Sequence, residues 1–221
     1  MRPLARTLAA TLALGAGAAR AHSPIQGVGD FYGGMLHPLL VPAHLIALIA
    51  VGLWLAQQRP VSGRALSATL LAVPLGMVAA AIGGWQNLEL PLLAVGAAVA
   101  LAVALARELP WAWRAGVGAW LGALLGADSL PDGLRDRALW MSLGGTWLSV
   151  FLVLALVVAL SDLAVRPWMK IGLRVLASWL AAAALLVLAL AALGPTGAPG
   201  SQATAAAPSC GRHAAWLASR A

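Results

Sequence analysis

The sequence predicts an all-α integral membrane protein, a bundle of about six transmembrane helices that follows a cleaved signal peptide. Hydrophobic residues make up 62% of the 221 positions and charged residues only 10%, whereas a soluble domain carries roughly a quarter charged residues. Six apolar stretches reach or nearly reach the roughly 20 residues that a helix needs to cross a bilayer. Stretches this long and this uniformly apolar indicate helices and not the strands of a membrane barrel.

Residues 1–21 have the three parts of a secretory signal. A short start with two arginines is followed by the apolar run 7–18, which is too short to span about 30 Å of hydrocarbon. A small-x-small pattern then ends at Ala21, so cleavage there would make His22 the first residue of the mature chain. An uncleaved first helix is the alternative.

The mature chain divides into an extracytoplasmic segment, a membrane domain and a tail. The segment covers 22–35, the six-helix domain 36–193, and the tail 194–221, whose Gly, Pro, Ala and Ser content predicts disorder. Gly122 and Gly126 have the spacing that lets helices approach closely in lipid, which favours packing within the bundle over a dimer interface. Turn residues and charges bound the six expected helices, which are 36–56, 66–83, 88–106, 111–127, 139–161 and 171–193.

Positive charge is distributed unevenly over the loops between these stretches. The loops after the first, third and fifth stretches hold most of the basic residues, and basic loops stay in the cytoplasm. This orientation places both mature termini outside, as a cleaved signal requires, and predicts a multi-pass protein of the bacterial inner membrane. The basic residues of these loops are Arg59, Arg64, Arg107, Arg114, Arg166, Lys170 and Arg174.

Several function classes are disfavoured. The net charge is +7, but no basic run or aromatic-basic interleaving marks a nucleic-acid surface. The single cysteine, Cys210, excludes an internal disulfide and a multi-cysteine metal site. An enzyme is not expected, because the chain has neither a G-x-S-x-G elbow nor an H-E-x-x-H motif. Without a Walker A loop, any pumping would need a partner or an ion gradient.

Three of the four histidines, His22, His37 and His44, lie near the start of the mature chain. A terminal histidine joins a free α-amine to an imidazole, a compact pair for a divalent metal, although an accidental Ala-His junction is the alternative. On one straight helix His37 and His44 share a face about 10 Å apart, too far to bind one ion together. Because Pro38 and Pro42 intervene, either the helix begins near Pro38 with two successive metal stations, or a broken segment brings the histidines closer.

Ionisable side chains within membrane segments are candidates for function. Imidazole suits nickel, cobalt, copper and zinc, and the spacing does not choose among them. Glu89, two residues before Pro91, is either a carboxylate that assists the metal or an interfacial residue that faces water.

The motifs around these histidines are distinctive. An Ala-His pair marks the start of the mature chain, and His37-Pro38-Leu39, His44-Leu45 and the run AVGLW at 50–54 follow. These motifs resemble those of the HupE/UreJ family, the hydrogenase- and urease-associated permeases. The resemblance implies a signal peptide, about six transmembrane helices, and transport of nickel or cobalt.

This chain departs from the family pattern at two places. The family's first-helix motif reads approximately His-Pro-x-x-Gly-x-Asp-His, and here Val41 and Ala43 replace the Gly and the Asp. The stretch 121–128, which corresponds to a second, histidine-rich motif, contains no histidine, and Asp128 is its one candidate ligand.

Two functions follow from these residues and from the resemblance. The first is a membrane permease for a divalent transition metal ion, with capture by His22, His37 and His44 and assistance from Glu89 or Asp128, and with no prosthetic cofactor. The alternative is a non-transporting metal-binding or accessory membrane protein that supports a metalloenzyme or another membrane complex. The expected partners are the lipid bilayer and the metal ion, and a homo-oligomer or partners in metalloenzyme maturation are left open.

Overall fold

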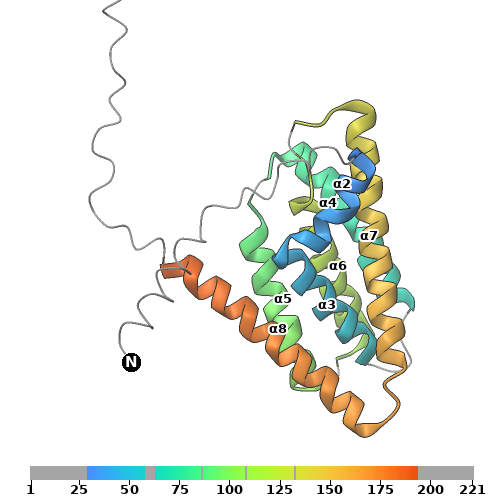
Figure 1. Ribbon diagram of the computed structural model, residues 1–221, viewed down its shortest axis with the longest axis vertical. Coiled ribbons are helices and arrows are strands. Elements are labelled where there is room, and N and C mark those ends of the chain that lie inside the picture. The colour runs from blue at the N-terminus through green and yellow to red at the C-terminus, as the bar shows by residue number, and fades with distance from the viewer. Residues whose placement is uncertain (1–28, 58–62, 86, 108, 132, 194–221) are drawn as a thin grey trace, which may run out of the picture. The chain divides into compact units, whose positions relative to one another are not determined.

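The computed structural model describes residues 29–57, 63–85, 87–107, 109–131 and 133–193. In this part of the chain every regular element is an α-helix, which confirms the predicted all-helical membrane class. The signal peptide, His22 and the tail lie outside the described residues, so what was expected of them stays a prediction. Figure 1 labels the helices, which are α2 (Asp30–Leu40), α3 (Pro42–Gln57), α4 (Gly63–Gly83), α5 (Glu89–Ala104), α6 (Trp111–Asp128), α7 (Asp136–Asp162) and α8 (Pro167–Leu193).

The chain divides into two compact units, Met1–Ala189 and Leu190–Ala221. In the second unit the described residues are 190–193, the end of α8. All packing and all sites below belong to the first unit.

The described helices differ in how well their length and hydropathy suit a membrane span. Within the described residues, α4, α7 and α8 are long and apolar enough to cross a membrane, and the bent pair α2–α3 raises the number to four. Helix α5 is apolar but has only 16 residues, about 24 Å at 1.5 Å per residue. Helix α6 contains Arg114, Asp128 and three tryptophans, which lower its hydropathy. Each of the six predicted stretches is nevertheless helical.

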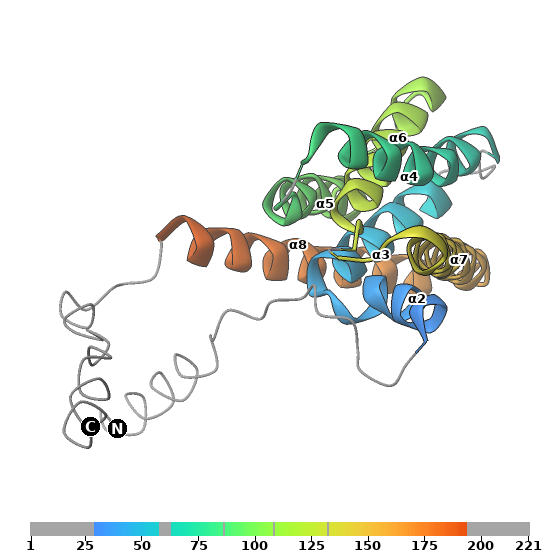
Figure 2. The same ribbon diagram turned by 90° about the horizontal axis from the view of Figure 1, so that it is seen from above.

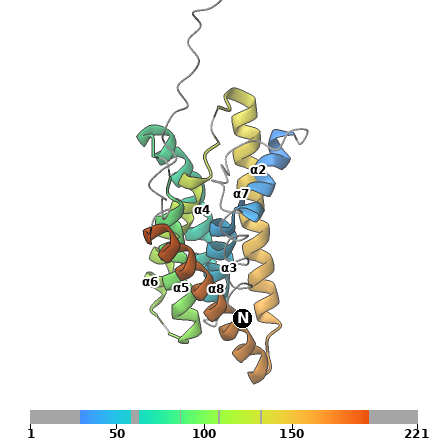
Figure 3. The same ribbon diagram turned by 60° about the vertical axis from the view of Figure 1, so that its left-hand side comes forward.

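Helix α3 forms the centre of the bundle. It contacts α2, α5, α6 and α7, and it is buried along most of its length, including Leu48, Val51 and Trp54. Viewed from above, α4 lies alongside α6, and α2 lies alongside α7 (Figure 2). Figure 3 shows α3 between α5 and α7, both of which it contacts. A site at either end of α3 is therefore enclosed by neighbouring helices.

Helices α4 and α6 approach each other through glycines. A Cβ atom at Gly76 would meet the backbone of Ala123, and one at Gly126 would meet the backbone of Val73. Gly122 also faces the α4 backbone. Only glycine permits this separation, so the expected packing of Gly122 and Gly126 within the bundle is confirmed.

Helix α2 contains a proline whose missing amide leaves one carbonyl without its helical partner. Pro38 has no N–H, so it makes no bond to the carbonyl of Gly34, four residues earlier. The hydroxyl of Thr146 on α7 donates to that carbonyl at 3.0 Å. Thr146 is almost fully buried, and in the membrane interior an unsatisfied carbonyl would have no water to bind.

Helix α4 also contains a proline that leaves a carbonyl without its helical partner, and a side chain of α7 again binds this carbonyl. Pro74 removes the bond to the carbonyl of Leu70, and the indole Nε1–H of Trp147 donates to this oxygen at 3.1 Å. The two donors are neighbours in the sequence of α7, and they serve helices on different sides of it. Helix α7 therefore holds two proline-containing helices by side-chain hydrogen bonds to their backbones.

Replacing Thr146 with valine keeps the side-chain shape and removes the donor. The variant should lower the free energy of unfolding by about 1–2 kcal/mol, because the Gly34 carbonyl loses its partner. In a Pro38→Ala background the amide at position 38 can satisfy this carbonyl, so Thr146→Val should then cost less. Reversible unfolding in mixed micelles measures both values, and an equal cost in the two backgrounds would contradict the assignment.

Candidate metal-binding site

The first predicted stretch is two helices joined by a sharp bend. Helix α2 begins at Asp30, before the expected start at 36, and meets α3 at 72°. Val41 lies between them in an extended conformation, with φ −86° and ψ 111°. The ring of Pro42 disfavours a helical conformation in the residue before it, which explains why the break falls at Val41.

The bend brings two histidines together. His37 lies in the last turn of α2 and His44 in the first turn of α3, and their ring centroids are 5.0 Å apart. Of the two geometries that the sequence allows, the broken segment is the one observed. His44 is fully buried and His37 is half-buried, so the pair extends from the core towards the surface of the bundle.

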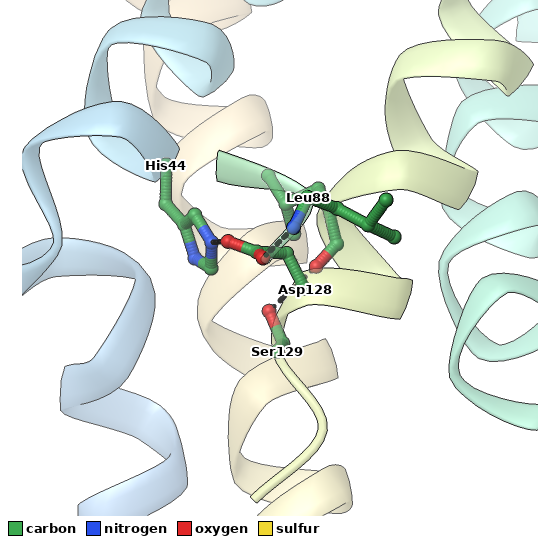
Figure 4. A network of polar contacts seen from close by, with 5 residues as sticks. His44, Leu88, Asp128 and Ser129 are labelled. Carbon is green, nitrogen blue, oxygen red and sulfur yellow. Dashed lines mark hydrogen bonds and ion pairs between the residues drawn. The ribbon is translucent and has the colours of Figure 1, made fainter. Parts of the chain in front are cut away.

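His44 has an acidic partner that is 84 residues away in the sequence. Its Nε2 lies 2.9 Å from Oδ2 of Asp128, the last residue of α6. Figure 4 shows the imidazole of His44 and the carboxylate of Asp128 pointing toward each other between their helices. Asp128 is only 8% exposed, so the contact is shielded from solvent.

The second carboxylate oxygen of Asp128 binds the start of another helix. Oδ1 accepts the backbone N–H of Leu88, the N-cap residue of α5, at 2.9 Å (Figure 4). A negative charge is unfavourable at the C-terminus of its own helix and favourable at the N-terminus of a neighbour. The α5 terminus therefore offsets the unfavourable placement of Asp128 at the end of α6. Ser129 completes that end by donating its hydroxyl to the carbonyl of Leu125 at 2.7 Å.

This arrangement selects one tautomer of His44. If the carboxylate of Asp128 is ionised it only accepts hydrogen bonds, and Nε2 of His44 then carries the proton that it donates. In the neutral ring, Nδ1 then has a lone pair. This nitrogen is buried and has no hydrogen-bond partner among the described residues. A histidine that gives one N–H to a carboxylate and keeps its other nitrogen free has the arrangement of a metal-ligating histidine.

The predicted site residues differ in where the structure places them. His37, His44 and Asp128 lie together, and Glu89 is exposed in the first turn of α5, outside the buried contact. His22 lies outside the described residues. Within the described residues, no three His, Cys, Asp or Glu side chains converge closely enough to hold a metal ion. The backbone amide of Leu88 has no sequence signal and was not predicted.

One apolar cavity lies away from these residues. It is an open groove of about 740 Å³ between α5 and α6, lined by apolar residues that include Trp54, Trp113 and Trp120. It has no histidine or carboxylate in its lining. Its apolar lining does not suit an ion, so the polar contacts at the start of α3 are the better candidate.

The comparison with known families gives one match. A model described as HupE / UreJ protein matches residues 9–191, most of the chain. The chain belongs to the HupE/UreJ family. No curated protein and no solved structure matches it. The resemblance carried by the histidine motifs is thus confirmed for this HupE/UreJ protein, and its apolar helices make it a multi-pass membrane protein.

The contact between His44 and Asp128 predicts energetic coupling in this HupE/UreJ protein. His44→Ala and Asp128→Ala each leave a buried polar partner unsatisfied, whereas the double variant removes both. The summed losses of the single variants should therefore exceed the loss of the double variant by about 1–3 kcal/mol.

The matched control for this cycle pairs His44→Ala with Glu89→Ala, because Glu89 is exposed and makes no contact with the histidine. These two changes should be additive. Free energies of unfolding in mixed micelles give both cycles, and additivity of His44→Ala with Asp128→Ala would show that the contact has no energetic weight.

Proposed function

We propose that this HupE/UreJ protein is a membrane permease for a divalent transition metal ion, with nickel or cobalt as the expected cargo and no catalytic reaction of its own. The family supports a role in nickel or cobalt transport or in an accessory step. The observation that carries the proposal is the buried, unpartnered Nδ1 of His44 beside the ring of His37.

In this proposal the two imidazoles bind the ion and the carboxylate positions one of them. Nδ1 of His44 supplies a neutral nitrogen ligand, and His37 supplies a second from across the bend. Asp128 fixes the tautomer and orientation of His44, and both of its oxygens are engaged in doing so. Nitrogen ligands of this kind suit nickel, cobalt, copper and zinc. Further ligands would come with a conformational change or from His22, which stays a prediction.

Asp128 also bears on the departure from the family motif. The motif implies an aspartate where this chain has Ala43, which is buried and has no group that can bind an imidazole. Asp128 brings a carboxylate to His44 from α6 instead. We propose that this contact provides the acidic partner of the site, so that the loss at position 43 need not abolish metal binding.

The position of the site supports capture from outside the cell. His44 lies at the start of α3, Asp128 at the end of α6 and Leu88 at the start of α5, so all three lie at one end of the bundle. The distribution of basic loops predicts that this end is extracytoplasmic. An ion arriving from that side would meet the half-buried His37 before the buried His44.

A non-transporting metal-binding or accessory protein is the second candidate. The observation that favours it is the small number of ligands: the described residues contain no group of three or more that could hold an ion. Binding by purified protein without accumulation in cells would support this function and would exclude the permease.

An Asp128→Asn variant tests the role of the carboxylate. The amide offers one acceptor to two donors, so its NH₂ must face either the fixed N–H of Leu88 or Nε2 of His44. When the NH₂ group faces Nε2 of His44, that nitrogen must accept a hydrogen bond, so the ring proton moves to Nδ1. Nδ1 then has no lone pair to bind a metal. We expect metal affinity to fall about 10–100-fold, the usual effect of losing such a partner.

Saturable uptake of nickel, cobalt, copper and zinc by cells that express the intact chain measures this effect, with the amount of membrane-inserted protein checked for each variant. Glu89→Gln makes the same chemical change at an exposed carboxylate and should leave uptake unaltered. Uptake by Asp128→Asn or by His44→Ala at the wild-type level would refute the assignment of these residues.

A further inference from the structure

A second cavity, distinct from the histidine site, lies at the other end of α3. It has a volume of about 370 Å³. Gln57, at the end of α3, lines it, and 13 residues separate Gln57 from His44, about 20 Å along the helix axis. Residues of α3, α5, α7 and α8 surround it, and those with polar side chains are Gln57, Ser161, Lys170 and Arg174.

The charge of this cavity is positive. Lys170 and Arg174, one turn apart near the start of α8, both line it, and no carboxylate is among the described lining residues. Asp162 follows Ser161 in the sequence but is exposed and does not line the cavity. Two cations that share a cavity repel each other, and a bound anion would relieve that repulsion.

One hydrogen bond anchors the guanidinium of Arg174. Its Nε donates to the carbonyl of Ala104, in the last turn of α5, at 3.0 Å. This bond uses one of the five guanidinium N–H donors, and the terminal nitrogens make no hydrogen bond to the described residues. A guanidinium anchored in this way presents a planar fork that matches the oxygens of a phosphate.

Gln57 contributes an acceptor in addition to these donors. Its Nε2 donates to the carbonyl of Val103 at 3.0 Å, while its Oε1 is buried without a partner in the described part of the chain. An acceptor beside two cations suits a ligand that combines an anionic phosphate with a hydroxyl donor. The glycerol headgroup of an anionic phospholipid has this combination.

The cavity lies at helix ends, where lipid headgroups are expected. Helices α3, α5 and α7 end beside it and α8 begins there. Leu163 and Val165, between α7 and α8, and Trp168, in the first turn of α8, are exposed large apolar side chains. Exposed apolar residues next to a basic cavity at helix ends are expected where the protein meets the interface of a membrane.

We propose that this cavity binds the phosphate group of an anionic phospholipid, with Arg174 and Lys170 as the phosphate ligands and Gln57 as acceptor for a headgroup hydroxyl. The proposal is independent of metal transport, since none of these residues belongs to the histidine site. Bound lipid would link the start of α8 to the ends of α3 and α5. The ligand group is a phosphate ester, which occurs in lipids and in soluble metabolites. The experiment below distinguishes these two kinds of ligand.

Native mass spectrometry of the purified full chain, titrated with phosphatidylglycerol, phosphatidylcholine or glycerol phosphate, tests the proposal. We expect tighter retention of phosphatidylglycerol than of phosphatidylcholine. Lys170→Gln should weaken phosphatidylglycerol binding by about five- to tenfold, and Lys170→Gln/Arg174→Gln by more than either single change. The Lys170 side chain makes no polar contact with the described residues, and its backbone N–H bond to the carbonyl of Arg166 is kept on substitution, so the variant should fold normally.

The matched control is Arg135→Gln/Arg137→Gln, which removes the same charge from exposed positions at the other end of the bundle. It should leave phosphatidylglycerol binding unaltered. Equal retention of the two lipids, or equal loss in the control and in the Lys170→Gln/Arg174→Gln variant, would overturn the proposal. Displacement of lipid by glycerol phosphate at similar concentration would keep the phosphate site but assign it to a soluble ligand.

Discussion

The position of the candidate site depends on one buried carboxylate. Asp128 is the last residue of α6. Its carboxylate accepts one hydrogen bond from Nε2 of His44 at the start of α3 and another from the backbone N–H of Leu88 at the start of α5. A carboxylate in a membrane bundle is costly unless its oxygens are satisfied, and these two donors satisfy both of them. The ends of three helices are thereby fixed relative to one another. The same bonds leave Nδ1 of His44 buried and without a hydrogen-bond partner in the described part of the chain.

Prolines provide the second constraint on the fold. They interrupt the helical hydrogen bonds of stretches whose hydropathy alone would predict continuous helices. Pro42 places the break at Val41 and so brings His37 to His44. The carbonyl freed by Pro38 is bound by Thr146, and Trp147 does the same for the carbonyl freed by Pro74 in α4. Helix α7 thus stabilises backbone irregularities that the site requires but that lipid would not tolerate.

The sequence predicted the helical class and the family, because apolar length and local motifs are short-range signals. The roles of His37 and His44 stay predictions. The sequence left open whether the two histidines meet, since proline permits both a late helix start and a bend. His44 and Asp128 lie on separate helices, so their contact is a long-range feature. The predicted topology placed both residues at the same end of the bundle but did not predict that they touch. The donor amide of Leu88 was not predictable, because every residue but proline has one. Two of the six expected spans, the short α5 and the only moderately apolar α6, fall outside the length and hydropathy typical of a spanning helix.

The most direct test of the central claim is the protonation of the His44 ring. Nitrogen NMR of ¹⁵N-histidine-labelled protein in bilayers distinguishes the two neutral tautomers, and the His44→Ala variant identifies the signals of this residue. The account predicts that His44 carries its proton on Nε2, and that its unprotonated Nδ1 signal shifts or broadens when nickel or cobalt is added. A ring protonated on Nδ1, or a His44 spectrum that does not respond to metal, would contradict it.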